Sequence, residues 1–132
     1  YMNASGDAVA PFARQIDASR DLLVVVDDVD LPVGRLRLRA SGSPGTHNGL
    51  RSVVERVGTR EFARLRCGVA PERAAEIDDL VEYVLARWPR GASEPVQRMV
   101  ARAADAAEDW ARSEDIGDVM TKVNPWPPAD GL

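Results

Sequence analysis

The chain has 132 residues, of which 45% are apolar and 29% charged, and this composition is ordinary for one globular domain. Its formal net charge of −4 argues against a protein that coats nucleic acid nonspecifically. One cysteine and one histidine exclude an internal disulfide and a zinc site of those residue types, and no apolar run approaches the roughly 20 residues of a membrane-spanning helix, so we expect a cytoplasmic protein without metal or cofactor.

The charges are unevenly distributed along the chain. Residues 33–70 carry eight basic and two acidic side chains, a net charge of +6. Residues 1–32 carry two basic and six acidic side chains, and residues 71–132 carry seven and thirteen. This pattern indicates an anion-binding patch on an acidic body, although a solvated arginine-rich surface would give the same counts.

The first two predicted elements are a helix and a strand. Apolar residues recur at helical spacing over residues 5–16, and Ser5 or Asn3 is available to cap the first free amides. Pro11 makes this helix short or bent. The uninterrupted apolar run at residues 22–26 predicts a strand buried on both faces, as in a sheet that is covered by helices.

A turn at residues 31–34 is predicted to lead into a second strand at residues 35–39. Alternation in this strand places three guanidinium groups on one face: Arg35, Arg37 and Arg39. A loop over residues 40–46 follows. The next element is a short helix over residues 50–57, which Gly58 is placed to end.

The last predicted strand covers residues 63–69, with Arg64 and Arg66 on one face. Three helical segments follow, at residues 77–85, 96–110 and 116–123. The proline-rich tail, residues 125–132, is expected to be disordered. This order of elements predicts an α/β fold with a mixed twisted sheet flanked by helices, in a single domain over residues 1–124.

Six different short motifs follow one another along the chain, at residues 1–6, 27–32, 45–50, 62–66, 83–85 and 119–124. In this order and spacing they resemble the bacterial-type peptidyl-tRNA hydrolase family over nearly the whole chain. The resemblance implies hydrolysis of the ester that joins a peptide to the 3′ ribose of tRNA, by a monomeric enzyme without a metal. Its partner is then peptidyl-tRNA, held at the acceptor end and the 5′ phosphate.

The resemblance identifies Asp27 as the carboxylate that orients a general-base histidine. It places that histidine before Tyr1, so we expect the chain to be incomplete at its N-terminus and inactive alone. His47 corresponds to a different position, in loop support beside the substrate asparagine. The residues alone leave another interpretation open, in which Asp27 and its acidic neighbours only solvate a strand end.

Three residues are expected to contact the ester end of the substrate. Asn3 and Asn48 match the asparagines that hold this end, and an amide suits the task because it can donate and accept hydrogen bonds at once. Tyr1 matches an aromatic position that lines the same cleft. For each asparagine, capping of the helix that follows is the alternative role.

Arg39 and Arg66 match the two basic positions that grip the tRNA 5′ phosphate in the family. A guanidinium group suits phosphate because its planar donors can engage two oxygens together. Arg35, Arg37 and Arg64 could extend the patch, although a plain surface charge is the simpler expectation for any one of them.

The chain departs from the family pattern in the loop before His47, which is usually richer in glycine and here contains Pro44 and Thr46. A noncatalytic RNA-binding relative, which would use the same fold and basic patch, is the alternative function, and a generic α/β interaction domain is a weaker one. The retained Asp27, Asn3 and Asn48 favour the enzyme, because an RNA scaffold has no chemical need for all three.

Overall fold

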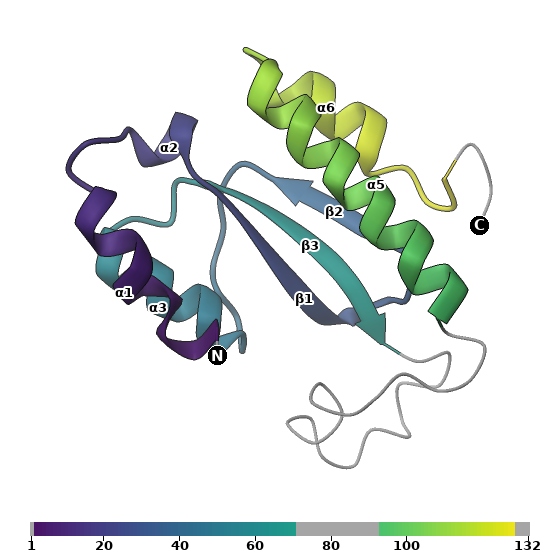
Figure 1. Cartoon of the computed structure of the whole chain (residues 1–132), viewed down its shortest axis with the longest axis horizontal. Helices are drawn as coiled ribbons and strands as arrows, with labels where there is room; N and C mark the ends of the chain where they lie inside the picture. Colours follow the sequence, from purple (N-terminus) through teal and green to yellow (C-terminus); the bar gives the residue numbers. More distant parts are fainter. Residues whose placement is uncertain (1, 71–92, 129–132) are drawn as a thin grey trace. The chain divides into compact units, whose positions relative to one another are not determined.

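The computed structural model describes residues 2–70 and 93–128 of the chain (Figure 1). Its elements, in chain order, are η1 (Met2–Ala4), α1 (Ser5–Val9), η2 (Ala10–Phe12), α2 (Ala18–Asp21), β1 (Leu23–Pro32), β2 (Leu36–Arg39), α3 (Asn48–Val57), β3 (Ala63–Ala70), α5 (Ser93–Arg112) and α6 (Ile116–Val123). None of the described helices is both long enough and apolar enough to cross a membrane.

The three strands form one mixed sheet in the order β1-β3-β2. The Ala63 amide donates to the Leu22 carbonyl at one end of the β1–β3 pair, and the Val33 amide donates to the Ala70 carbonyl at the other, so these strands are parallel. Figure 1 shows β2 running in the opposite direction along β3. The predicted α/β fold with a mixed sheet flanked by helices is confirmed.

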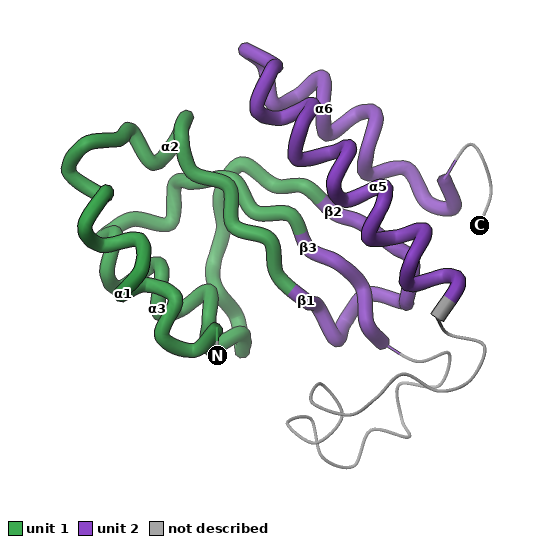
Figure 2. The backbone as a smooth tube through the Cα atoms, viewed as in Figure 1, with its two compact units in different colours: residues 1–26, 38–65 green, residues 27–37, 66–132 purple. Residues whose placement is uncertain are grey.

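The chain divides into two compact units, and the division runs through all three strands (Figure 2). Unit 1 contains residues 1–26 and 38–65, and unit 2 contains residues 27–37 and 66–132. The single domain over residues 1–124 stays a prediction.

Unit 1 is built around the apolar side of α3. Its core consists of Val24, Val26, Leu50, Val53 and Phe62. Helix α1 approaches α3 closely at Gly6, where an added Cβ would lie 2.2 Å from the Ser52 carbonyl oxygen. The Gly6 amide donates to Ser52 Oγ at 3.0 Å. A glycine is required at this contact because any side chain would separate the two helices.

Unit 2 contains α5 and α6. Buried apolar side chains from the two helices are Met99, Ala106 and Val119. Lys122 of α6 pairs with Asp109 of α5 at 2.9 Å. The Arg102 guanidinium donates to the Gly34 carbonyl at 3.1 Å, which joins α5 to the turn after β1.

The first predicted helix is short, as Pro11 implies, but its predicted cap is wrong. Helix α1 ends at Val9, and a 3-10 turn that contains Pro11 follows it. The N-cap of α1 is Ala4, and it makes no side-chain hydrogen bond. Neither Ser5 nor Asn3 caps this helix, because Asn3 already lies in the 3-10 turn η1 and does not have the extended backbone of a capping residue.

The first strand is longer than predicted, and its burial differs. It runs from Leu23 to Pro32, so its aspartates lie within the strand and not beyond its end. Val24 and Val26 are buried, whereas Val25 is 48% exposed. Burial on both faces was therefore a wrong expectation. Since side chains alternate along a strand, the core of unit 1 covers only the face that carries Val24 and Val26.

The remaining elements follow the prediction closely. The second strand begins at Leu36, one residue later than expected. Helix α3 ends at Gly58, whose φ of 85° is left-handed. Helices α5 and α6 contain the predicted segments 96–110 and 116–123. The segment 77–85 lies outside the described residues, and disorder of the tail stays a prediction.

Candidate functional site

The residues predicted to form the site fall into two groups, one in each unit. The group in unit 1 contains Asn3, Arg39, His47 and Asn48. The group in unit 2 contains Asp27 and Arg66. Tyr1 lies outside the described residues.

His47 is the N-cap of α3. Its backbone is extended, and its Nδ1 accepts a hydrogen bond from the Leu50 amide at 3.0 Å. The imidazole therefore satisfies an amide that has no partner within the helix. Asn48 is the first residue of α3 and is exposed, so its side chain does not supply this cap.

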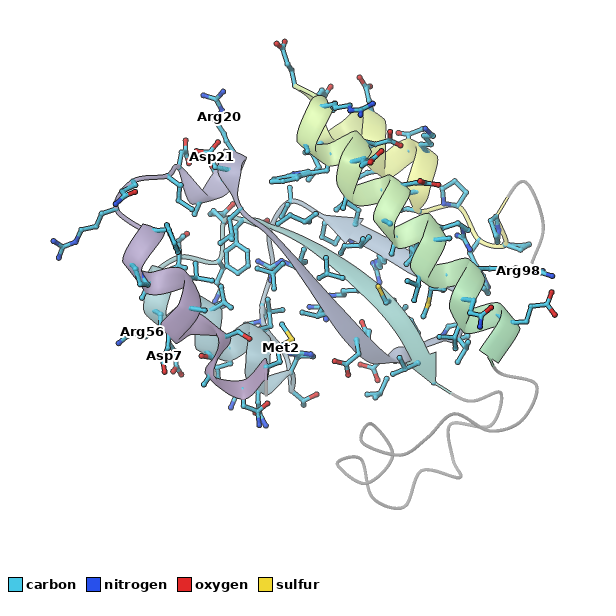
Figure 3. All side chains as sticks on the ribbon, in the orientation of Figure 1. Met2, Asp7, Arg20, Asp21, Arg56 and Arg98 are labelled. Carbon is cyan, nitrogen blue, oxygen red and sulfur yellow. The ribbon has the colours of Figure 1, made fainter. Side chains whose placement is uncertain are left out.

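Met2 seats η1 on the first turn of α3. An added Cβ at Gly49 would lie 2.5 Å from Met2 Cγ and 2.9 Å from the Met2 carbonyl oxygen. This contact requires a glycine and brings η1 directly against the start of α3, with Met2 labelled in Figure 3. Asn3 and Asn48 are consequently on neighbouring elements of unit 1, and both are exposed.

Arg64 is not a surface charge. Its side chain is 1% exposed, and its guanidinium lies 4.4 Å from the centre of the Phe62 ring. It donates to the carbonyl oxygens of Gly42 at 2.7 Å, Arg60 at 2.6 Å and Phe62 at 3.2 Å. Both expected roles of Arg64, an extension of the basic patch and a solvated charge, are therefore wrong. The loop that carries Gly42 lies over it, a contact that strand alternation does not reveal.

The loop before His47 is held at a second point. Arg51 of α3 donates to the Gly45 carbonyl at 3.0 Å. Gly42 and Gly45 have φ angles of 147° and 56°, in the region that disfavours other residues. Although the loop also contains Pro44 and Thr46, it thus has glycine at the two positions where its backbone requires it.

In unit 2, Arg66 pairs with an aspartate on the neighbouring strand. Its Nη1 lies 3.4 Å from Asp28 Oδ2, and the two side chains are 20% and 12% exposed. The other oxygen of Asp28 accepts the Asp30 amide at 2.8 Å. Asp28 therefore orients a guanidinium and a backbone amide and does more than solvate a strand end.

Asp27 is half-buried in β1, and its charge acts on Cys67. Burial of the Cys67 thiol, with a smaller contribution from the Asp27 carboxylate, raises the pKa of Cys67 to about 11. This thiol is therefore protonated at neutral pH, which makes it a poor nucleophile and a poor metal ligand. No group of three His, Cys, Asp or Glu side chains that could hold a metal ion occurs among the described residues.

Arg35, Arg37 and Arg39 are half-buried, whereas Leu36 and Leu38 between them are buried, as the alternation predicts. Arg39 belongs to unit 1, and the structure shows no ion pair for it within residues 2–70 and 93–128. The Nε atom of Arg35 is buried and has no hydrogen-bond partner within the same ranges.

Sequence reasoning missed the residues that support the site. The seating of Met2 on Gly49, the hydrogen bond from Arg51 to Gly45 and the pair formed by Asp28 and Arg66 were not predicted. A signal existed only for the last contact. Asp28 follows the predicted strand at residues 22–26, and its charge is opposite to that of Arg66 on the predicted strand at residues 63–69. Opposite charges favour pairing once the two strands are known to be neighbours.

The family model and the sequence relatives that match this chain point to the same family. A family model described as peptidyl-tRNA hydrolase matches residues 1–130. A peptidyl-tRNA hydrolase of Chloroflexus aggregans is 45% identical over 127 residues, which are 95% of this chain and 66% of that protein. The corresponding protein of Oceanobacillus iheyensis is 38% identical over 125 residues, which cover 94% and 66% of the two chains.

Solved structures agree with this result. The crystal structure of peptidyl-tRNA hydrolase from Acinetobacter baumannii matches with a TM-score of 0.81 and 30% identity. The match covers 98% of this chain and 64% of that one. The chain thus spans somewhat less than two thirds of the length of these relatives.

Proposed function

Because the chain belongs to the peptidyl-tRNA hydrolase family, we propose that it binds peptidyl-tRNA and supplies the residues that hold and orient the ester for hydrolysis. The observation that carries this proposal is the family match over residues 1–130, which is nearly the whole chain. Hydrolysis of peptidyl-tRNA is the reaction that the names of its relatives give for them.

The ester end of the substrate is assigned to Asn3 and Asn48. Both side chains are exposed, and the contact of Met2 with Gly49 places their elements side by side. A carboxamide can donate to an ester or peptide carbonyl and accept from a peptide amide. The cap made by His47 fixes the first turn of α3 and with it the backbone of Asn48.

Asp27 is assigned the role of orienting the general base. A carboxylate beside an imidazole selects its tautomer and stabilises the imidazolium that forms when water gives up a proton. The 132 residues contain one histidine, His47, and its Nδ1 is used by the cap of α3. We therefore propose that these residues bind the substrate without cleaving it.

The 5′ phosphate is assigned to Arg39 and Arg66. Arg66 already faces Asp28, so a phosphate must share this guanidinium with the carboxylate or displace it. The Arg39 guanidinium has no such competitor in the described part of the chain. Contacts of this kind give salt-sensitive affinity that is largely independent of sequence.

A hydrolysis and binding assay with the purified 132-residue chain tests the proposal. The substrate is tRNA that carries an N-blocked aminoacyl ester. We expect saturable binding and ester cleavage at the rate of the protein-free control. Absence of binding would contradict the function. Cleavage above the control, abolished in His47→Ala, would make His47 the base and overturn its assignment to the cap alone.

The alternative function is noncatalytic RNA binding, favoured by the net charge of +6 over residues 33–70. The two functions differ in what they recognise. A family hydrolase distinguishes acylated from uncharged tRNA, because Asn3 and Asn48 contact the acyl group, whereas a general RNA-binding surface contacts only the nucleic acid. Equal affinity for the two tRNAs would therefore favour the alternative.

A further inference from the structure

Arg64 is a buried charged side chain whose hydrogen bonds go to the backbone of three separate residues. Its guanidinium donates to the carbonyls of Gly42, Arg60 and Phe62. Burial of a charge costs free energy that only well-placed hydrogen bonds can offset. Because Arg64 is only 1% exposed, the folded chain must hold those three carbonyl groups in place around its guanidinium.

The carbonyl of Gly42 belongs to the loop that ends at the proposed ester-binding asparagine. Five residues further on, the His47 amide donates to the Pro44 carbonyl at 3.1 Å. His47 Nδ1 then accepts the Leu50 amide. Arg64 thus holds the start of this loop, and these two hydrogen bonds of His47 hold its end at the first turn of α3, where Asn48 lies.

We propose that Arg64 is a positioning residue: its buried guanidinium fixes the loop over residues 40–46 and thereby sets the orientation of His47 and Asn48 toward the acyl end of the substrate. This inference rests on the proposed function for its role in binding, whereas the restraint on the loop is independent of it. Arg64 itself touches no substrate atom in this proposal.

The side chain must be arginine for this role. A guanidinium presents five donors in a planar fork and can reach carbonyls on different sides at once, whereas the ammonium of lysine is a single point. Arg64→Lys therefore keeps the charge but loses the geometry. Arg56 offers a matched control on α3. It pairs with Asp7 at 3.3 Å, it is 55% exposed, and Figure 3 shows the two side chains next to one another.

The first measurement is the ratio of affinities for two ligands: tRNA with an N-blocked aminoacyl group attached through a non-hydrolysable amide, and uncharged tRNA. In Arg64→Lys, we expect the preference for the acylated ligand to fall by about 3- to 10-fold, the effect of one misplaced hydrogen bond, with unchanged affinity for uncharged tRNA. Arg56→Lys should keep the wild-type ratio.

A second variant guards against a change in folding. Gly42→Ala leaves Arg64 in place but strains the residue whose carbonyl it binds, because the φ of Gly42 is 147°. It should lower the same preference as Arg64→Lys. A general loss of folded protein would instead reduce the apparent concentration of sites for both ligands equally and leave the ratio unchanged.

Amide hydrogen exchange supplies a readout that does not depend on function. In Arg64→Lys, the His47 and Leu50 amides should exchange faster than in the wild type, while the Gly58 amide at the far end of α3 should not change. Wild-type exchange at His47 and Leu50 together with a wild-type ligand ratio would overturn the inference. A wild-type chain that shows no preference for acylated tRNA would instead contradict the proposed function, and the exchange rates would then decide on Arg64 alone.

Discussion

Arg64 and Arg66 lie two residues apart on β3, yet their surroundings differ in almost every respect. Arg64 is enclosed and donates to backbone carbonyls, among them that of Gly42 in the loop over residues 40–46. Arg66 is partly exposed and faces the carboxylate of Asp28. The difference shows that residue type and strand alternation do not determine the role of an arginine. The role is set by what the rest of the chain places over it, a backbone in one case and an acid in the other.

The largest expected effect is on stability. Arg64→Met should lower the free energy of unfolding by on the order of 3 kcal/mol, because several carbonyl oxygens lose their donor while the loop still covers them. Arg66→Met should cost less, about 1 to 2 kcal/mol, because Asp28 keeps partial contact with water and the hydrogen bond from the Asp30 amide. Urea denaturation followed by circular dichroism measures both values. Equal losses would show that the two arginines are not distinguished by burial.

The second expected effect is on the reactivity of the Cys67 thiol, which follows Arg66 in β3. With its pKa raised to about 11 from 9.0, Cys67 should react with iodoacetamide at pH 8 about 100-fold more slowly than an exposed cysteine. Asp27→Asn removes the smaller of the two causes, so it should lower the pKa of Cys67 and speed alkylation. The pH dependence of the alkylation rate reports the pKa directly. If the pH dependence of the alkylation rate is unchanged in Asp27→Asn, the Asp27 carboxylate does not influence this thiol.

The same pKa shift has a consequence for stability. Above pH 9 the unfolded chain releases the thiol proton while the folded chain retains it, so the contribution of Cys67 to stability is present below pH 9 and is lost as the pH rises to about 11. A Cys67→Ala chain should lose less stability over this range than the wild type.

The third effect concerns the end of the loop that Arg64 restrains. His47→Ala should destabilise the chain by about 1 kcal/mol, because the Leu50 amide loses its partner. His47→Asn should retain most of the stability, since asparagine is a favoured N-cap residue. Thermal unfolding of the two variants checks this. A destabilisation of the same size in both would mean that the imidazole acts through packing and not through its hydrogen bond.

The smallest expected effect lies at the pair of Arg66 and Asp28. Asp28→Asn removes a carboxylate that competes with phosphate for the guanidinium, so affinity for tRNA should rise by about two- to threefold at low salt. The gain should shrink as salt is added. Fluorescence anisotropy with labelled tRNA is sufficient to detect it. A weaker complex would instead indicate that Asp28 holds Arg66 in the orientation that phosphate requires.

Local signals in the sequence predicted much of the fold. The bounds of α6 match the apolar spacing at residues 116–123, and Gly58 ends α3 as expected. Both features depend on contacts within a few residues. The end of β1 was missed because the charged residues from Asp27 to Asp30 suggest a loop, whereas pairing with β3 keeps them in the strand.

The same distinction between local and long-range contacts applies to the site. Family motifs supplied its residues, and the structure describes all of them except Tyr1. The pairing of Arg66 with Asp28, 38 residues apart, and the burial of Arg64 by Gly42, 22 residues apart, depend on contacts that no local pattern encodes. Sequence could therefore name the chemistry of the site but could not identify the side chains that position it.

The most direct test of the account is the affinity of the 132-residue chain for tRNA that carries the non-hydrolysable acyl group, with and without its 5′ phosphate, measured over a range of salt concentrations. We predict that loss of the phosphate weakens binding, that Arg39→Ala weakens it and lowers the slope of log affinity against log salt by about 0.7 to 0.9, and that the two changes together add little more. Identical affinities with and without the phosphate would contradict the assignment of Arg39 to the 5′ end of tRNA. So would an Arg39→Ala variant that loses as much affinity for tRNA without the phosphate as for tRNA with it.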